Sequence, residues 1–317
     1  MNEKNKISIR LVLVIIFLMI IFYSIISIYS GVEDISANFK SMNFLYVMPI
    51  IGIVLMSIIF RSYIQKLLLE QIGIKLPLKD NFLLFLSGLA LIISPGGTGQ
   101  VIKSYFLKEK YGIPISKSIP VILFERYYDL ISITALVIIS ISVFFSFEAF
   151  IVSILALIII FIVSIALRKE SLFTKFLSLQ KKTMFMKQLE INEKELYLSV
   201  KLLNNYSLVW KIAVLTTLVT FWDGIAIYMG FLSFGTDIGY FEATQFYYTS
   251  LILGVMSLIP GGMGVLEGGF TILSSKYLEM TLAVSIIIFI RLTTIWFTTF
   301  LGIIVAFRTL FRHKIRF

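Results

Sequence analysis

The chain has 317 residues, of which 58% are hydrophobic and only 15% are charged, and its mean hydropathy is +0.96. A soluble protein of this length could not bury so much apolar surface, so the composition argues against a soluble helical bundle and predicts an all-α polytopic membrane protein. Cysteine is absent and the single histidine is His313, which excludes disulfides, thiol catalysis, cysteine-bound metal centres and a histidine-based triad. We therefore expect no cofactor, no metal site and no enzymatic activity.

Several apolar runs are long enough to cross the bilayer core, which takes roughly 20 helical residues. We predict full spans at about 9–29, 43–60, 118–146, 149–167, 207–233 and 281–306. Two further runs, 82–94 and 243–259, lead directly into the motifs SPGGTG and IPGGMG. The first of these runs would reach only about 20 Å as a helix, which is too short for a core of about 30 Å. We therefore predict two re-entrant hairpins, each with a glycine-rich turn at its tip.

The two hairpin motifs belong to an internal repeat. Pro95 and Pro260 are 165 positions apart, and the same shift relates Arg126 to Arg291. The repeated glycines are Gly96, Gly97 and Gly99 in the first motif and Gly261, Gly262 and Gly264 in the second. We expect a single transmembrane domain over 1–317, with a first repeat at about 43–146, a second at about 207–306 and a cytoplasmic linker at about 168–205. The linker sequence is also consistent with an interfacial helix.

The distribution of basic residues predicts the orientation. With the N-terminus in the cytoplasm, only Lys40 and Lys276 fall outside and only Arg126 and Arg291 fall within spans, so 24 of the 28 basic residues lie inside. Three spans separate the hairpins, so the hairpins have opposite orientations and the repeat is inverted, as in many secondary transporters. We expect a multi-pass protein of the cell membrane with both termini cytoplasmic. The net charge of +10 is then explained by basic residues that face anionic lipid headgroups, and it does not indicate binding to nucleic acid.

Charged residues inside the predicted spans are the candidate site, since a charge at membrane depth is expensive unless it has a function or a partner. We expect substrate contacts from Arg126, Arg291 and Lys103 and from the six motif glycines, whose turns leave backbone amides free for an anion. We expect four carboxylates to balance these charges or to carry coupled protons: Glu125, Asp129, Asp223 and Glu267. Purely structural pairing, Arg126 with Asp129 and Arg291 with Asp223 or Glu267, is the alternative for each residue.

With the motifs SPGGTGQVIKSYFL, FERYYDL and IPGGMGVLEGGF, followed by Arg291, the chain resembles the flippase-like family named after the transmembrane region of lysylphosphatidylglycerol synthase. In the multiple peptide resistance factors of this family the domain is a lipid flippase, and a separate soluble domain makes the aminoacyl lipid. Archaeal relatives are linked to dolichyl-phosphate-linked glycan pathways. Because the sequence ends at Phe317, shortly after the last span, we expect no synthase domain here.

The resemblance and the inverted repeat together imply a lipid flippase or transporter for an anionic phospholipid or a polyprenyl-phosphate-linked lipid. Membrane lipids are the expected partners. Further copies of the chain, and lipid-modifying or glycan-assembly enzymes, are left open as partners. Two alternatives remain: a membrane-embedded glycosyl- or lipid-transferase with Glu125 or Asp129 as base, and a non-transporting scaffold for envelope assembly.

The inverted orientation predicts the accessibility of single cysteines, which can be introduced cleanly into a chain without any. A membrane-impermeant thiol reagent added to intact cells should label a cysteine at position 237 and spare cysteines at 110 and 182, because positive-inside topology places the last two in the cytoplasm. Permeabilised cells, in which all three positions should react, are the control. Labelling at 110 with protection at 237 would contradict the inverted repeat.

Overall fold

The computed structural model describes residues 31–169 and 192–313, and all regular secondary structure in these ranges is helical. The predicted span at 9–29 and most of the linker at 168–205 lie outside the described residues. The elements, in chain order, are α2 (Val32–Ser41), η1 (Phe44–Tyr46), α3 (Val47–Gln71), α4 (Leu78–Leu89), η2 (Pro95–Val101), α5 (Ile102–Tyr111), α6 (Ile115–Val143), α7 (Phe147–Arg168), α10 (Glu193–Leu203), α11 (Tyr206–Ser233), α12 (Tyr240–Met256), η3 (Pro260–Gly262), α13 (Val265–Ser274), α14 (Met280–Arg291), η4 (Leu292–Trp296) and α15 (Phe297–His313).

Several of these helices have the length and composition of membrane spans. In the described ranges four stretches qualify, Phe44–Gln71, Phe147–Arg168, Tyr206–Ser233 and Met280–Arg308, and each overlaps a span predicted from the sequence. The 29-residue helix α6 is equally long but carries Glu125, Arg126 and Asp129. The all-helical membrane class is thus confirmed, while the full number of spans stays a prediction.

Helix α3 continues well beyond the end predicted for its span. The apolar run predicts a span that ends at residue 60, with Arg61 in a cytoplasmic segment, whereas the helix runs to Gln71. Ile64, Leu68 and Leu69 continue the buried stripe of the helix. The helix ends where Gly73 takes a left-handed conformation (φ 76°) and the Ile74 N–H donates to the Leu69 carbonyl. Arg61 therefore lies inside a long helix and not in a loop.

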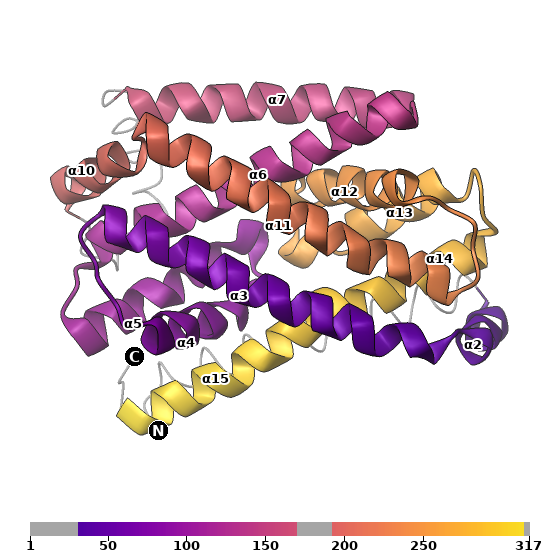
Figure 1. Cartoon of the computed structure of the whole chain (residues 1–317), viewed down its shortest axis with the longest axis horizontal. Coiled ribbons are helices and arrows are strands. Elements are labelled where there is room, and N and C mark those ends of the chain that lie inside the picture. Colours follow the sequence, from indigo (N-terminus) through magenta and orange to yellow (C-terminus); the bar gives the residue numbers. More distant parts are fainter. Residues whose placement is uncertain (1–30, 170–191, 314–317) are drawn as a thin grey trace.

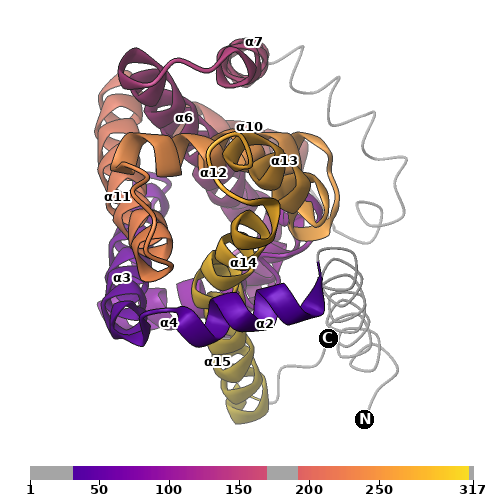
Figure 2. The ribbon, with the colours of Figure 1, turned by 90° about the vertical axis from the view of Figure 1, so that its right-hand side faces the viewer.

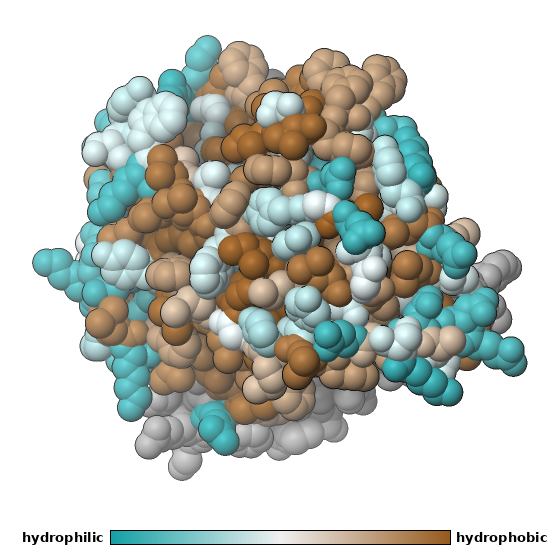
Figure 3. Space-filling model, turned by 45° about the vertical axis from the view of Figure 1, so that its right-hand side comes forward, coloured by the Kyte–Doolittle hydropathy of each residue, from teal (hydrophilic) through white to brown (hydrophobic). Residues whose placement is uncertain are grey.

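The outer surface of the described helices is strongly apolar. Helix α7 buries only Ala149, Val152, Ser153 and Ala156, while large side chains such as Phe161 and Ile162 are exposed. Figure 3 shows apolar residues over most of the middle of one face, with hydrophilic residues gathered mainly toward two opposite sides. Such a band is what a lipid-facing surface requires, because hydrocarbon solvates apolar side chains and offers nothing to polar ones.

Two helix pairs occupy opposite ends of the long helices. In Figure 1 the pair α4–α5 lies toward the left end and the pair α12–α13 toward the right. The first pair shares a core with α3, α6, α10 and α11, which includes Leu84, Phe106 and Phe124. The second shares a core with α6, α7, α11 and α14, which includes Phe246 and Phe270. Each pair is therefore anchored in its own hydrophobic cluster, and the glycine-rich turns of the two pairs meet between them.

Short polar contacts hold two peripheral features in place. Asp80, at the start of α4, accepts hydrogen bonds from Lys110 Nζ at 2.8 Å and Tyr111 Oη at 2.6 Å at the end of α5, and the hydrogen bond from Lys110 is the main reason that the pKa of its carboxyl is lowered. The unpredicted helix α2 lies across one end of the bundle in front of α14 (Figure 2), where Asn38 Nδ2 donates to Ser285 Oγ at 3.1 Å. Both contacts add polar links to segments that also pack through apolar side chains, such as Phe39 of α2 and Leu107 of α5.

Helix α15 packs on α4 with almost no space between the two backbones. A Cβ atom on Gly302 would lie 2.7 Å from the Leu89 carbonyl carbon and nearer still to the Ala90 nitrogen. Backbone atoms cannot move aside as the tip of a flexible side chain can. This contact holds the first helix pair against the C-terminal helix.

We expect Gly302→Ala to destabilise the protein by about 1–3 kcal/mol, the usual range for overpacking, because the two helices must separate. Gly52→Ala, in the interior of α3 with open space around it, is the matched control and should be neutral or stabilising by up to about 1 kcal/mol. The measurement is the thermal unfolding midpoint of the purified protein in detergent. Equal midpoints for the two variants would contradict this packing.

Candidate functional site

The site forms where the two glycine-rich turns touch. A Cβ atom on Gly261, in η3, would lie 2.8 Å from Ile93 Cγ2, just before η2. The turn at η3 also packs against its own first helix, because a Cβ on Gly262 would lie 3.0 Å from the Gly254 Cα. Both Gly261 and Gly262 have positive φ, which other residues adopt only with strain. Glycine is therefore needed here both for the turn and for the close approach.

Each turn faces the arginine that the repeat pairs with it. A Cβ on Gly97 would lie 3.2 Å from Arg126 Cδ, and a Cβ on Gly261 would lie 3.5 Å from Arg291 Nη2. Arg291 Nη2 donates to the Gly261 carbonyl at 2.6 Å. The two arginines differ in exposure, since the side chain of Arg126 is 33% exposed and that of Arg291 is 1% exposed. The two arginines therefore occupy equivalent positions in the repeat but differ in their exposure.

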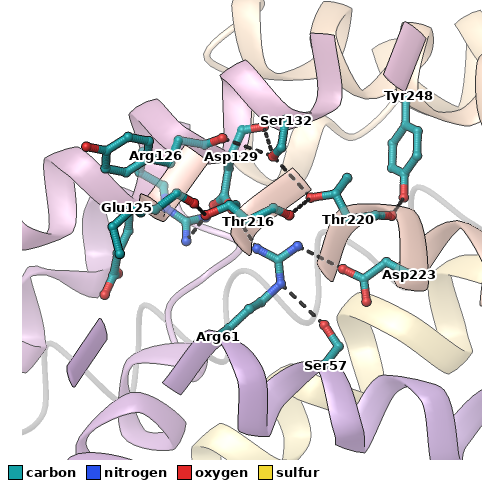
Figure 4. A network of polar contacts seen from close by, with 12 residues as sticks. Ser57, Arg61, Glu125, Arg126, Asp129, Ser132, Thr216, Thr220, Asp223 and Tyr248 are labelled. Atoms are coloured by element: carbon teal, nitrogen blue, oxygen red, sulfur yellow. Dashed lines mark hydrogen bonds and ion pairs between the residues drawn. The ribbon is translucent and has the colours of Figure 1, made fainter. Parts of the chain in front are cut away.

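A three-helix ion network lies beside Arg126 and is centred on Arg61 (Figure 4). Arg61 Nη1 contacts Asp129 Oδ1 of α6 at 2.5 Å, and Arg61 Nη2 contacts Asp223 Oδ2 of α11 at 2.8 Å. The second oxygen of Asp129 contacts Arg126 Nη2 at 2.9 Å, and Arg61 Nε donates to Ser57 Oγ at 3.3 Å. One guanidinium therefore joins α3, α6 and α11 at the point where they cross.

Around this network, hydroxyl groups extend the polar contacts between α6, α11 and α12. Thr220 Oγ1 donates to Ser132 Oγ at 3.0 Å, and Tyr248 Oη donates to the Thr220 carbonyl at 2.7 Å (Figure 4). These hydrogen bonds link α6 to α11 and α11 to α12 next to the charged residues of the network.

The remaining charged residues of the candidate site form two buried ion pairs. Arg291 Nε lies 3.0 Å from Glu267 Oε1, and the other oxygen of Glu267 accepts the Gly264 N–H at 2.8 Å, which caps α13. Lys103 Nζ lies 2.5 Å from Glu125 Oε2 and donates to Gln65 Oε1 at 2.9 Å. Together with Arg61 and Arg126, four cations therefore meet four carboxylates, and the group as a whole is electrically balanced.

A cavity of about 320 Å³ opens between the turns and this network. Its polar wall contains Arg61, Arg126, Asp129, Asp223 and Arg291. The remaining wall is mostly apolar. Its large apolar members are Val54, Ile58, Phe85, Leu89, Ile92, Leu130, Ile133, Ile227, Leu251, Ile252, Val255, Ile259 and Ile295. Guanidinium groups suit a phosphate, the carboxylates suit an ammonium group, and the apolar wall suits a hydrocarbon chain.

The residues predicted from the sequence divide into two groups. Those that line the cavity are Gly97, Arg126, Asp129, Asp223, Gly261, Gly262 and Arg291. Lys103, Glu125 and Glu267 are buried and are not among the residues that line the cavity, nor are Gly99 and Gly264, and Gly96 lies in the first turn. Arg291 pairs with Glu267, and Asp223 pairs with Arg61 instead.

The turn amides are largely engaged with the protein itself, contrary to our expectation that they would be free. The N–H groups of Gly97 and Gly262 donate to the carbonyls of Ser94 and Ile259, at 2.8 and 2.9 Å. The Gly99 N–H donates to Ser94 Oγ at 2.5 Å, and the Gly264 amide is taken by Glu267. In a tight turn, backbone carbonyl groups and side-chain oxygens of the turn itself lie within hydrogen-bond distance of the first amides. The arginines are accordingly the better candidates for an anionic group.

Arg61 is the functional candidate that the sequence analysis missed. It was counted with the basic residues of a cytoplasmic segment because the apolar run was ended at residue 60. The signal that could have found it is the continuing helical spacing of apolar residues after Arg61, up to the glycine at 73. A basic residue within such a pattern is in a helix and requires a partner.

A model of the protein family described as "Lysylphosphatidylglycerol synthase TM region" matches residues 7–302, nearly the whole chain. The chain belongs to this family. A search of the curated proteins finds no match. Membership confirms the resemblance inferred from the two glycine motifs and supports a membrane location. It also places Arg61, Arg126 and Arg291 within the matched region.

Removal of the Arg61 guanidinium leaves Asp129 and Asp223 close together without their shared cation. We expect Arg61→Met to lower the thermal unfolding midpoint, with a loss of order 2 kcal/mol, since each charge-assisted hydrogen bond contributes about 1.5–3 kcal/mol and these side chains are partly exposed. Adding Asp223→Asn should restore part of the loss.

A double-mutant cycle gives the control. The coupling of Arg61 with Asp223 should exceed that of Lys276 with Glu148, an ion pair whose side chains are about half exposed and for which we expect less than about 1 kcal/mol. A coupling as small as that of the surface pair would show that Arg61 does not join the three helices.

Proposed function

We propose that the protein is a lipid flippase or transporter which moves an anionic phospholipid or a polyprenyl-phosphate-linked lipid between membrane leaflets. The observation that carries the proposal is the cavity between the two glycine-rich turns, where partly exposed guanidinium groups stand beside a long apolar wall. An amphiphile needs both kinds of surface at once. The family match supports the same conclusion, because it covers the cavity and both turns.

In this proposal the helix pairs α4–α5 and α12–α13 are re-entrant hairpins that enter from opposite sides of the membrane. Their placement toward opposite ends of the long helices in Figure 1, and the contact between their tips, support this arrangement. Opposed hairpins that meet near the midplane suit alternating access, in which one central site opens to each side in turn. We place the protein in the cell membrane with both termini in the cytoplasm.

The arginines act by exchanging partners. In the structure Arg126 holds Asp129 through one Nη atom, while its Nε is buried without a hydrogen-bond partner. A phosphate that enters the cavity can take the remaining donors of Arg126 in a planar, two-point contact. Asp129 keeps its contact with Arg61, so the carboxylate is not left uncompensated when Arg126 turns toward the lipid. The headgroup crosses in this polar region while the acyl or prenyl chain stays against the apolar wall and the bilayer.

The purified protein in liposomes should accelerate the leaflet exchange of a labelled phosphatidylglycerol or a labelled prenyl phosphate, followed by an impermeant quencher. Arg126→Gln should weaken headgroup binding about 10- to 150-fold, the equivalent of about 1.5–3 kcal/mol for a charge-assisted contact. Arg126→Lys should recover only part of the loss, because lysine lacks the planar fork.

Empty liposomes and the surface variant Lys276→Gln are the controls, and the Lys276 variant should behave as the wild type. The proposal fails if no labelled lipid crosses faster than in empty liposomes. If, in addition, Arg126→Gln still complements a deletion strain, the scaffold alternative takes its place. Formation of a new glycosylated or acylated lipid in the same vesicles would favour a transferase.

A further inference from the structure

We propose that the buried pair Lys103–Glu125 is a proton-binding site coupled to the headgroup cavity, so that a proton and an anionic lipid are taken up together. The inference rests on the proposed function, because it concerns what drives the same transport. It gives Lys103 a role different from the headgroup contact expected from the sequence.

The site is built into the first helix pair and its neighbours. Lys103 comes from α5 and Glu125 from α6, their side chains are 3% and 7% exposed, and their charged atoms lie 2.5 Å apart. The lysine stem runs over Gly88, where a Cβ atom would lie 2.7 Å from its Cγ and Cδ. Its ammonium group also lies 5.4 Å from the centre of the Phe85 ring. A glycine, an aromatic ring and an amide thus surround one buried lysine.

The corresponding ion pair of the second repeat has different chemistry. There too a buried pair joins the second helix of the hairpin to the long helix that follows, but the cation is Arg291 on α14 and the carboxylate is Glu267 on α13. An arginine does not release its proton in proteins, whereas a lysine and a glutamate can each change their charge. Both members of the pair Lys103–Glu125 can therefore change their charge, whereas in the pair Arg291–Glu267 only the glutamate can.

The charges that act on this pair come mainly from α6. Arg126 and Asp129 lie on the same helix as Glu125, while α3 contributes the neutral Gln65 and α4 the Phe85 ring. Four polar atoms nearby are buried without a hydrogen-bond partner: Gln100 Nε2, Ser104 Oγ, Glu125 Oε1 and Arg126 Nε. Gln100 and Ser104 flank Lys103 in the chain, and Arg126 lines the cavity. Because Arg126 also acts electrostatically on Lys103, the charge of the pair and the charge at the cavity influence each other.

The charge balance links the two binding events. With Lys103 charged and Glu125 ionised, the pair carries no net charge. When a proton from bulk water forms an O–H bond on the Glu125 carboxylate, the pair gains one positive charge next to Arg126. An anionic headgroup at Arg126 compensates that charge, so each ligand favours the other, and the coupling is reciprocal. Release of both on the opposite side restores the neutral pair.

The test uses the full chain in liposomes that contain labelled phosphatidylglycerol, with and without a pH gradient. If one proton accompanies each lipid, a gradient of one pH unit should shift the steady-state ratio of the label between leaflets by up to about tenfold. Glu125→Gln should abolish this shift. So should the double variant Lys103→Met/Glu125→Gln, which removes both buried charges together and avoids an unpaired lysine. Glu125→Asp, which keeps a titratable carboxylate, should restore part of it.

A second measurement does not require transport. Binding of a short-chain phosphatidylglycerol to the purified wild type should take up protons from a weakly buffered solution, read with an indicator dye, and the Glu125→Gln variant should not. The control variant Lys276→Gln/Glu148→Gln, which removes an exposed ion pair, should respond as the wild type in both assays.

The outcomes separate the two ideas. If no labelled lipid crosses, the proposed function fails. If lipid crosses but its distribution ignores the pH gradient, or if binding takes up no proton, only the coupling fails. A gradient response that persists in both Glu125→Gln and the double variant would place the proton elsewhere and overturn the assignment to this pair.

Discussion

The constraint on which the structure depends is that a charge buried at membrane depth must find an opposite charge. The ion pairs around the site contain four cations, Arg61, Lys103, Arg126 and Arg291, and their partners come from neighbouring helices more often than from the same one. Arg61 alone joins α3 to α6 and α11. Apolar packing between lipid-facing helices is weakly directional, because lipid tails are as apolar as leucine. Ion pairs with fixed geometry can therefore determine where these helices cross. The cavity lies beside these ion pairs.

The same constraint explains why the turns must be glycine. For the two hairpin tips to meet beside the charges, Gly261 must approach the side chain of Ile93 and Gly262 must approach the backbone at Gly254. A side chain at Gly261 would meet Ile93 of the other turn, and a side chain at Gly262 would meet the backbone of α12 in its own hairpin. The turns also satisfy most of their own amides, which leaves the guanidinium groups as the exposed donors. In this way the glycine motif determines the shape of the site, while the arginines supply hydrogen-bond donors in its wall.

The class of fold, the two breaks in the helices and the pair Arg126–Asp129 could be predicted from the sequence, because each follows from a local pattern or from the cost of a lone charge. For Arg291 the sequence left Asp223 and Glu267 open as partners, and the structure pairs it with Glu267. The contact between Arg61 and Asp223 could not, because it depends on where α3 crosses α11, and composition says nothing about crossing points. The burial of Lys103 could not be predicted either. Its aliphatic side chain packs against Gly88, and this contact forms only when α4 and α5 pack together. Helix α2 could not be predicted in this way, because six of its ten side chains are polar or charged and it has no strong apolar run.

The difference between the two arginines has a local cause with a wider consequence. Three residues after Arg126 the chain has Asp129, whereas three residues after Arg291 it has Thr294, so Arg126 finds a carboxylate on its own helix and Arg291 must take Glu267 from α13. A partner on the same helix leaves Arg126 free to face the cavity. A partner on another helix holds Arg291 against the second hairpin, where its side chain lines the cavity but is only 1% exposed. A π-helix, η4, begins directly after Arg291, and such irregular turns are frequent where helices must adjust. Arg291 thus ties α14 to α13 through Glu267 and to η3 through the Gly261 carbonyl, whereas the Arg61 network joins the long helices α3, α6 and α11.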